Sequence, residues 1–111
     1  MKKKFGPAFA GIAAALQHKS VRLQFLLGAL ALLVGFILKL TYMEWIAFDL
    51  CIGMVLAAEL LNTAVEFLCN CITTQFDSRI KTIKDISAGA VLLTAISAFV
   101  TALMIFVHHI T

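Results

Sequence analysis

The sequence carries little charge for its length. Only 14% of its 111 residues are Asp, Glu, Lys or Arg, whereas 62% are hydrophobic. A soluble chain is about half apolar and a quarter charged, because its surface must face water. The composition therefore excludes an ordinary soluble domain and indicates one membrane-embedded domain over residues 1–111.

Several familiar signatures are also missing. The sequence contains neither a Walker loop nor a Gly-rich kinase loop, so it is not a standard nucleotide-binding fold. Its three cysteines form neither a zinc pattern nor a Cys-x-x-Cys redox motif, and we interpret Cys51, Cys69 and Cys71 as small apolar residues. No small-residue cleavage site stands out, so we expect no removed signal peptide.

Long apolar runs are what the chain has in abundance. They are Leu23–Leu38, Trp45–Ala58 with Asp49 inside it, and Ile86–Val107. A helix of about 20 residues crosses a hydrocarbon core of about 30 Å. The sequence therefore predicts an all-α integral membrane protein, with transmembrane helices at about 22–40, 45–72 and 84–108.

A shorter helix is predicted before the first span, at about 5–18. Pro7 suits its first turn, and apolar residues recur at helical spacing along one face. The other face is small rather than polar, so the helix either lies in the headgroup layer or packs against another helix. We favour the interface because lysines flank this segment on both sides.

Basic residues are spread unevenly along the chain. Five precede the first span and three lie between the second and third, whereas the intervening loop holds only Lys39. The positive-inside rule then predicts a cytoplasmic N-terminus and 2–3 loop, with the C-terminus outside. The net charge of +3 reflects this topology, and nothing suggests nucleic-acid binding.

Two details of the first span predict how it packs. Gly28 and Gly35 lie seven residues apart on one face, and small residues let membrane helices approach closely. The span should end in a tight turn at residues 41–44, which Trp45 anchors in the aromatic belt.

One stretch places acids and an amide inside an apolar run. It reads Glu59-Leu-Leu-Asn62-Thr-Ala-Val-Glu66, so Glu59, Asn62 and Glu66 share one helical face. Acids in a membrane helix are costly and indicate a functional site. Hard oxygen ligands suit Mg²⁺ with substrate phosphates, a carboxylate can deprotonate a hydroxyl, and a lysine can hold phosphate.

With Lys84-Asp85 expected to open the third span, these residues indicate phosphoryl transfer from ATP to a lipid alcohol. At a helix start, Asp85 would favour the positive end of the helix dipole. A non-catalytic scaffold or an ion-coupling transport subunit would also explain buried acids. Either alternative leaves Lys84-Asp85 as a coincidence.

Two strings resemble the signature of the prokaryotic diacylglycerol kinase family. They are Glu59-Leu-Leu-Asn62-Thr-Ala-Val-Glu66 and Lys84-Asp85-Ile-Ser-Ala-Gly-Ala-Val, and the spelling looks most like the Gram-positive undecaprenol kinase branch. The resemblance implies a lipid kinase domain in the bacterial cell membrane, assembled as a homotrimer with shared active sites. The implied reaction uses Mg²⁺ and ATP to phosphorylate undecaprenol. The alternatives are diacylglycerol as substrate and a catalytically weakened homologue that acts as a membrane scaffold.

The resemblance also implies a role for each site residue. Glu59 would be the catalytic base for the lipid hydroxyl, Glu66 would bind Mg²⁺, and Asn62 would orient the site between them. Lys84 would contact the phosphates, and Asp85 would hold Lys84 and the nucleotide in place. The remaining nucleotide contacts would come from Gln75, Phe76 and Asp77.

Three positions depart from the family pattern. His18 stands where a Glu usually supplies another metal ligand, and imidazole is a poor ligand for magnesium. Asn70 stands where an Asp is common, and Asp77 where a His is common. These departures leave the fold assignment unchanged and leave the number of metal ions and the nucleotide affinity open.

Overall fold

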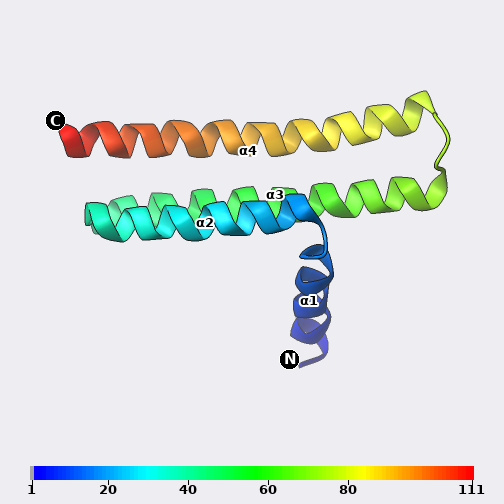
Figure 1. Cartoon of the computed structure of the whole chain (residues 1–111), viewed down its shortest axis with the longest axis horizontal. Coiled ribbons are helices and arrows are strands. Elements are labelled where there is room, and N and C mark those ends of the chain that lie inside the picture. The colour runs from blue at the N-terminus through cyan, green and yellow to red at the C-terminus, as the bar shows by residue number, and fades with distance from the viewer. Residues whose placement is uncertain (1) are drawn as a thin grey trace.

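A computed structural model describes residues 2–111 of the chain, with side chains from residue 5 onward. It is all-helical (Figure 1), and the described helices are α1 (Lys2–Ala15), α2 (Lys19–Leu38), α3 (Tyr42–Ile72) and α4 (Ser78–Ile110). The last three are long and apolar enough to cross a membrane. The predicted all-α class, with three membrane-length apolar helices and a shorter N-terminal helix, is confirmed.

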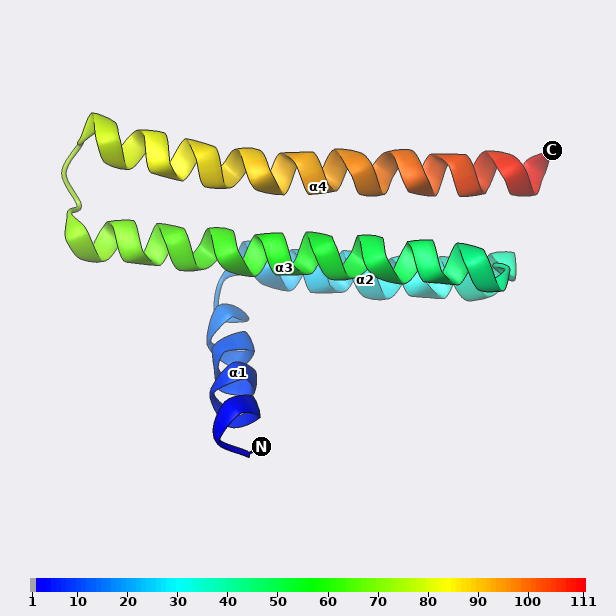
Figure 2. The same cartoon turned by 180° about the vertical axis from the view of Figure 1, so that it is seen from behind.

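The three long helices run side by side, and α3 makes the most extensive contacts, first with α4 and then with α2. Figures 1 and 2 show the α3–α4 loop at one end of this bundle, here called the loop end. The α2–α3 turn and the C-terminus lie at the opposite end, here called the turn end. The shorter α1 runs across the bundle axis, and both α3 and α4 continue past it toward their loop.

The predicted start of the third span, at about 84, is too late for the helix. α4 begins at Ser78, where the Asp77 side chain accepts a hydrogen bond of 2.8 Å from the Arg79 backbone N–H and so caps the helix. The polar residues that follow are compatible with a helix, so helical structure starts before the apolar run does. Asp85 consequently lies about two turns inside α4, not at its positive end.

The boundary between α1 and α2 also differs from the prediction. α1 ends at Ala15, not near 18, and α2 begins at Lys19, not near 22. The chain turns between them because His18 takes an extended conformation, with φ −86° and ψ 132°, at the N-cap of α2. A residue outside the helical region of φ/ψ space ends one helix and allows the next to start in a new direction.

The turn between α2 and α3 lies at residues 39–41, not at 41–44 as predicted, because α3 already begins at residue 42. Thr41 caps α3, and its side chain and that of Glu44 exchange hydrogen bonds with each other's backbone N–H groups in a capping box. Lys39, in the left-handed region at φ 56°, ends α2. The Phe36 and Trp45 rings pack 4.9 Å apart across the turn.

The predicted glycine seam of α2 faces α3. A Cβ added at Gly28 would meet Ile52 at 3.5 Å, an ordinary contact, whereas one at Gly35 would lie 2.9 Å from Trp45. Outside this seam few apolar side chains are buried, and most large ones on the three long helices are exposed. Such surfaces suit hydrocarbon or further protein rather than water.

Candidate active site on the polar face of α3

Four polar side chains follow one face of α3 toward the loop end. They are Glu59, Asn62, Glu66 and Asn70, here called the polar face. Steps of three and four residues keep them on one side of the helix over about 16 Å of its axis. Glu59 is buried, with 6% of its surface exposed, whereas Glu66 and Asn70 are exposed. The face therefore runs from a buried acid to open polar groups.

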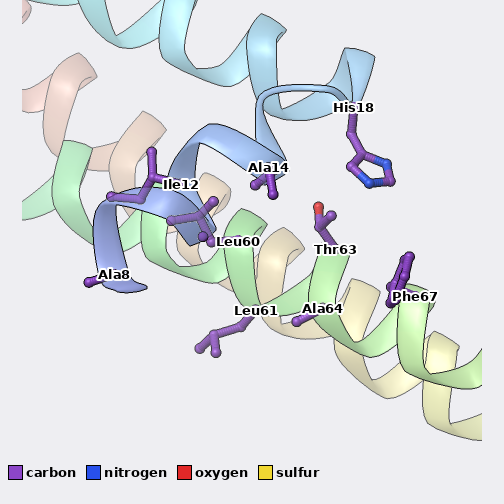
Figure 3. A pocket seen from close by; sticks show the side chains of 11 residues that line it. Ala8, Ile12, Ala14, His18, Leu60, Leu61, Thr63, Ala64 and Phe67 are labelled. Atoms are coloured by element: carbon purple, nitrogen blue, oxygen red, sulfur yellow. The ribbon is translucent and has the colours of Figure 1, made fainter. Parts of the chain in front are cut away.

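The level at which α1 crosses α3 indicates how deep each residue of the polar face would lie in a membrane. Between α1 and α3 lies a cleft of about 500 Å³, lined on the α3 side by apolar side chains and Thr63 (Figure 3). The helical rise puts Thr63 about 32 Å from Tyr42, close to the thickness of a hydrocarbon core. An α1 lying in the headgroup layer would thus put Glu59 just inside the boundary and Asn70 beyond it.

Asn62 has one satisfied and one unsatisfied polar atom. Its Nδ2 donates a hydrogen bond of 3.3 Å to Glu66 Oε1. Its Oδ1 is buried and has no partner among the described residues. A buried acceptor without a partner costs free energy, so this oxygen suits a donor or cation supplied by a bound group.

The donor set at Asn62 and Glu66 fits magnesium in its chemistry. Both offer hard oxygens, and magnesium usually completes its coordination with water and substrate phosphates rather than with protein alone. No cluster of three or more His, Cys, Asp or Glu side chains that could hold a metal is found in the described part of the chain. A site here would therefore depend on the substrate for its remaining ligands.

Lys84 reaches the polar face from α4. Its ammonium donates a hydrogen bond of 2.9 Å to Asn70 Oδ1 and so joins the two helices near the loop end. Asp85 pairs instead with Lys81, at 2.7 Å, one helical turn away. The expected contact of Asp85 with Lys84 is thus corrected, because adjacent residues on a helix point in different directions whereas residues four apart share a face.

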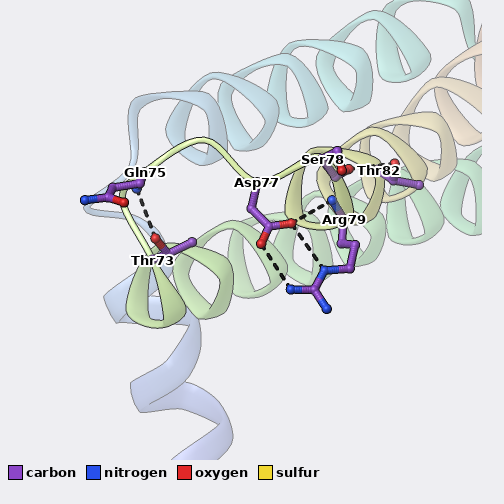
Figure 4. Close-up of polar contacts among 6 residues, drawn as sticks. All are labelled: Thr73, Gln75, Asp77, Ser78, Arg79 and Thr82. Atoms are coloured by element: carbon purple, nitrogen blue, oxygen red, sulfur yellow. Dashed lines mark hydrogen bonds and ion pairs between the residues drawn. The ribbon is translucent and has the colours of Figure 1, made fainter.

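Two of the three loop residues proposed for the nucleotide, Gln75 and Asp77, form hydrogen bonds with residues close to them in the sequence (Figure 4). The Gln75 N–H donates to Thr73 Oγ1 at 3.0 Å, and Phe76 is 83% exposed. Asp77 accepts hydrogen bonds from the side chain and the backbone N–H of Arg79, and these hold the pKa of its carboxyl below its usual value. The roles of these residues in binding stay predictions.

His18 lies beside α1 and not against Glu66. It lines the cleft between α1 and α3, where Figure 3 shows its ring beside Thr63 and Phe67. Glu66 does not line that cleft. A shared metal ion between His18 and Glu66 stays a prediction with no contact to support it.

Asn70 is the site residue that sequence reasoning treated only as a departure from a pattern. Its spacing, four residues after Glu66, already predicts a place on the polar face if α3 continues that far. Its hydrogen bond to Lys84 was not predictable in the same way, because that contact depends on how α3 and α4 align.

The fold and this site define a small helical protein with three membrane-length helices and a row of polar side chains on α3 toward the loop end. A family model for prokaryotic diacylglycerol kinase matches residues 6–106, and the chain belongs to that family, as its motifs predicted. It is similar to the undecaprenol kinase of Bacillus subtilis (strain 168), with 39% identity over 75 residues. That match covers 68% of this chain and 61% of the relative, so it spans less than two thirds of the relative's length.

Proposed function

We propose that this protein transfers a phosphoryl group from ATP to a membrane lipid alcohol, and that undecaprenol is its preferred acceptor. The family match over residues 6–106 carries this proposal, because that match contains both the polar face of α3 and Lys84. The name of the Bacillus relative supports undecaprenol, and the description of the family supports diacylglycerol as the alternative acceptor.

Glu59 is the catalytic base in this proposal. It is the buried member of the polar face, about one turn from the level at which α1 crosses α3, where the hydroxyl of a membrane lipid would lie. Its carboxylate takes the hydroxyl proton as the oxygen forms its bond to the γ-phosphorus and the bond from that phosphorus to ADP breaks. The proton remains on Glu59 until the product leaves.

The other groups position and neutralise charge. Lys84 binds phosphate oxygens as a point charge, Asn62 orients the site, and Asp85 contacts the nucleotide. Bound Mg²⁺ would neutralise phosphate charge, and Glu66 with the Asn62 carbonyl oxygen would hold it.

The remaining proposed contacts are those of His18 with the metal and of the α3–α4 loop with the nucleotide. His18 is a poor candidate for a magnesium ligand because it offers imidazole and lines a cleft that Glu66 does not line. The proposed nucleotide contacts of the loop are Gln75, Phe76 and Asp77.

We further propose that the protein sits in the bacterial cell membrane with the loop end in the cytoplasm. Arg79, Lys81 and Lys84 are at that end, and the positive-inside rule favours it on the cytoplasmic side, where ATP is available. The C-terminus would then lie outside. The same orientation gives the polar face access to nucleotide from water and to the lipid from the bilayer.

A homotrimer with shared active sites is also part of the proposal. No residue in the most apolar 18-residue stretch of α4 is fully buried, and most of the large apolar side chains of α4 are exposed. Asp49 is exposed on α3 within a membrane-length helix, and a carboxylate facing lipid is costly. Contacts with further copies of the chain would cover both surfaces.

Phosphorylation assays in mixed micelles test the function. The purified full-length protein would receive Mg-ATP with undecaprenol or diacylglycerol, and the Bacillus undecaprenol kinase would serve as the positive control. We expect phosphate on undecaprenol at a higher kcat/KM than on diacylglycerol. If neither lipid is phosphorylated while the control is active, the protein is a weakened homologue or scaffold and the proposal is wrong.

A further inference from the structure

Three cations lie in the first two turns of α4, and they have different kinds of partner. Arg79 pairs with Asp77 at 3.3 Å, and Lys81 pairs with Asp85 at 2.7 Å. The partner of Lys84 is the side-chain oxygen of Asn70, at 2.9 Å, which is neutral. Among the side chains described from residue 5 onward, no carboxylate lies within ion-pair distance of Lys84.

The hydrogen bond from Lys84 fixes where its charge is presented. Asn70 follows Glu66 by one helical turn on the polar face, so the bond draws the Lys84 ammonium from α4 to that face. Lys84 is half-buried, which restricts its flexible side chain further. An ammonium has three N–H donors, and Asn70 uses one of them. Two donors and the full positive charge remain for an anion.

We propose that Asn70 is a positioning residue that holds the Lys84 ammonium for the phosphates of the nucleotide without neutralising it. The inference rests on the proposed kinase function and adds to it a residue that acts through Lys84 rather than on the substrate. An acid at this position would hold the ammonium equally well, but its charge would compete with phosphate. An apolar residue at position 70 would leave the Lys84 ammonium charged but would no longer hold it in place.

The substitutions Asn70→Asp and Asn70→Ala test separately whether the Lys84 ammonium must be held in place and whether its charge must stay unneutralised. Asp has almost the shape of Asn and is common at this position in the family, so the variant is expected to fold. Thr74→Asp is the matched control, since Thr74 is exposed near the same end of α3 and has no hydrogen bond to Lys84. Each protein would be assayed in mixed micelles for kcat and for the KM of Mg-ATP, and separately for equilibrium binding of Mg-ATP.

We expect Asn70→Asp to raise the KM and the Kd for Mg-ATP about tenfold while kcat stays within about threefold. We expect Asn70→Ala to lower kcat about tenfold with a smaller change in KM, because the charge is present but misplaced. Thr74→Asp should change the KM less than about twofold, since its added charge is exposed and screened by salt. If Asn70 only stabilised the fold, both substitutions would lower the melting temperature, and they would not separate into one that changes KM and one that changes kcat.

The outcomes distinguish the inference from the function on which it rests. An Asn70→Asp protein that binds Mg-ATP as tightly as the wild type overturns the inference, whatever the lipid assay shows. A wild type that binds Mg-ATP but phosphorylates neither lipid overturns the proposed function, and the binding comparison still decides the role of Asn70. A wild type that does not bind Mg-ATP overturns both.

Discussion

The two ends of the helical bundle treat their polar groups differently. At the turn end, Glu44 Oε1 accepts a hydrogen bond of 2.8 Å from the Thr41 N–H and lies 2.8 Å from His109 Nε2, so it ties the start of α3 to the last turn of α4. At the loop end, the buried Asn62 Oδ1 has no partner within the described residues, and Lys84 has a neutral one.

This difference separates structural from chemical roles. Native proteins satisfy nearly all buried polar groups, so a group left unsatisfied is a candidate for binding something else. The turn end should contribute to stability, because the Glu44 carboxylate bonds to the His109 ring and to the Thr41 N–H, and the Thr41 hydroxyl accepts from the Glu44 N–H. The loop end should contribute to activity, and substitutions at the two ends should therefore have opposite signatures.

The largest effect is expected from Glu59→Gln at the inner limit of the polar face. The amide keeps the shape of the side chain but cannot accept the hydroxyl proton, so kcat should fall by about 10²–10⁴-fold. Melting temperature and oligomeric size should stay close to wild type. Kinetics in mixed micelles and thermal melts check both points, and a kcat within tenfold of wild type would remove Glu59 from the proposed chemistry.

Lys84→Met, compared with Lys81→Met, tests whether the partner of a lysine determines its role. Lys84 has a neutral partner and Lys81 an acidic one, so the phosphate should depend on the first far more than on the second. We expect kcat/KM for Mg-ATP to fall about 100-fold for Lys84→Met and less than about threefold for Lys81→Met. Equal losses in the two variants would contradict the distinction drawn at the loop end.

Gly35→Ala tests the turn end by overpacking. The added Cβ would lie 2.9 Å from Trp45 and 3.2 Å from Leu40, so these side chains must move, at a cost of about 1–3 kcal/mol. The melting temperature should fall, while kcat per folded protein stays unchanged. Gly53→Ala is the control, since its Cβ would meet nothing within 4 Å. If Gly35→Ala keeps its stability but loses turnover, the turn end does not have the purely structural role assigned to it.

The smallest effect is expected from Asp77→Asn, which removes the charge at the loop end but keeps a good helix cap. Hydrogen bonds from Arg79 lower the pKa of Asp77 in the folded protein. The carboxylate therefore stabilises the fold above its unfolded pKa, and this contribution disappears as the pH falls through the folded pKa.

Thermal melts of wild type and Asp77→Asn should thus differ slightly at pH 7, because an exposed ion pair contributes little. The difference should close as the pH falls below the ordinary range of an aspartate. A gap that widens in acid would show that Asp77 does not titrate as its contacts with Arg79 require.

Part of the loop end could be predicted from local spacing. Glu59, Asn62 and Glu66 recur at helical intervals, and the Asn62–Glu66 hydrogen bond spans four residues. The pair Lys81–Asp85 also spans four residues and was open to the same reasoning. It was missed because the apolar run was taken as the limit of the helix, whereas the Asp77 cap starts α4 earlier.

The sequence by itself determined the number of membrane-length helices, the face of α3 that carries the acids, and the family. The first two follow from hydropathy and helical period, which need only neighbouring residues. The family followed from the resemblance of two short motifs. Only the tertiary structure decided that Lys84 bonds to Asn70, that His18 lines a cleft that Glu66 does not line, and that His109 meets Glu44. These relations depend on the register between packed helices, which the spacing of residues within one helix does not specify.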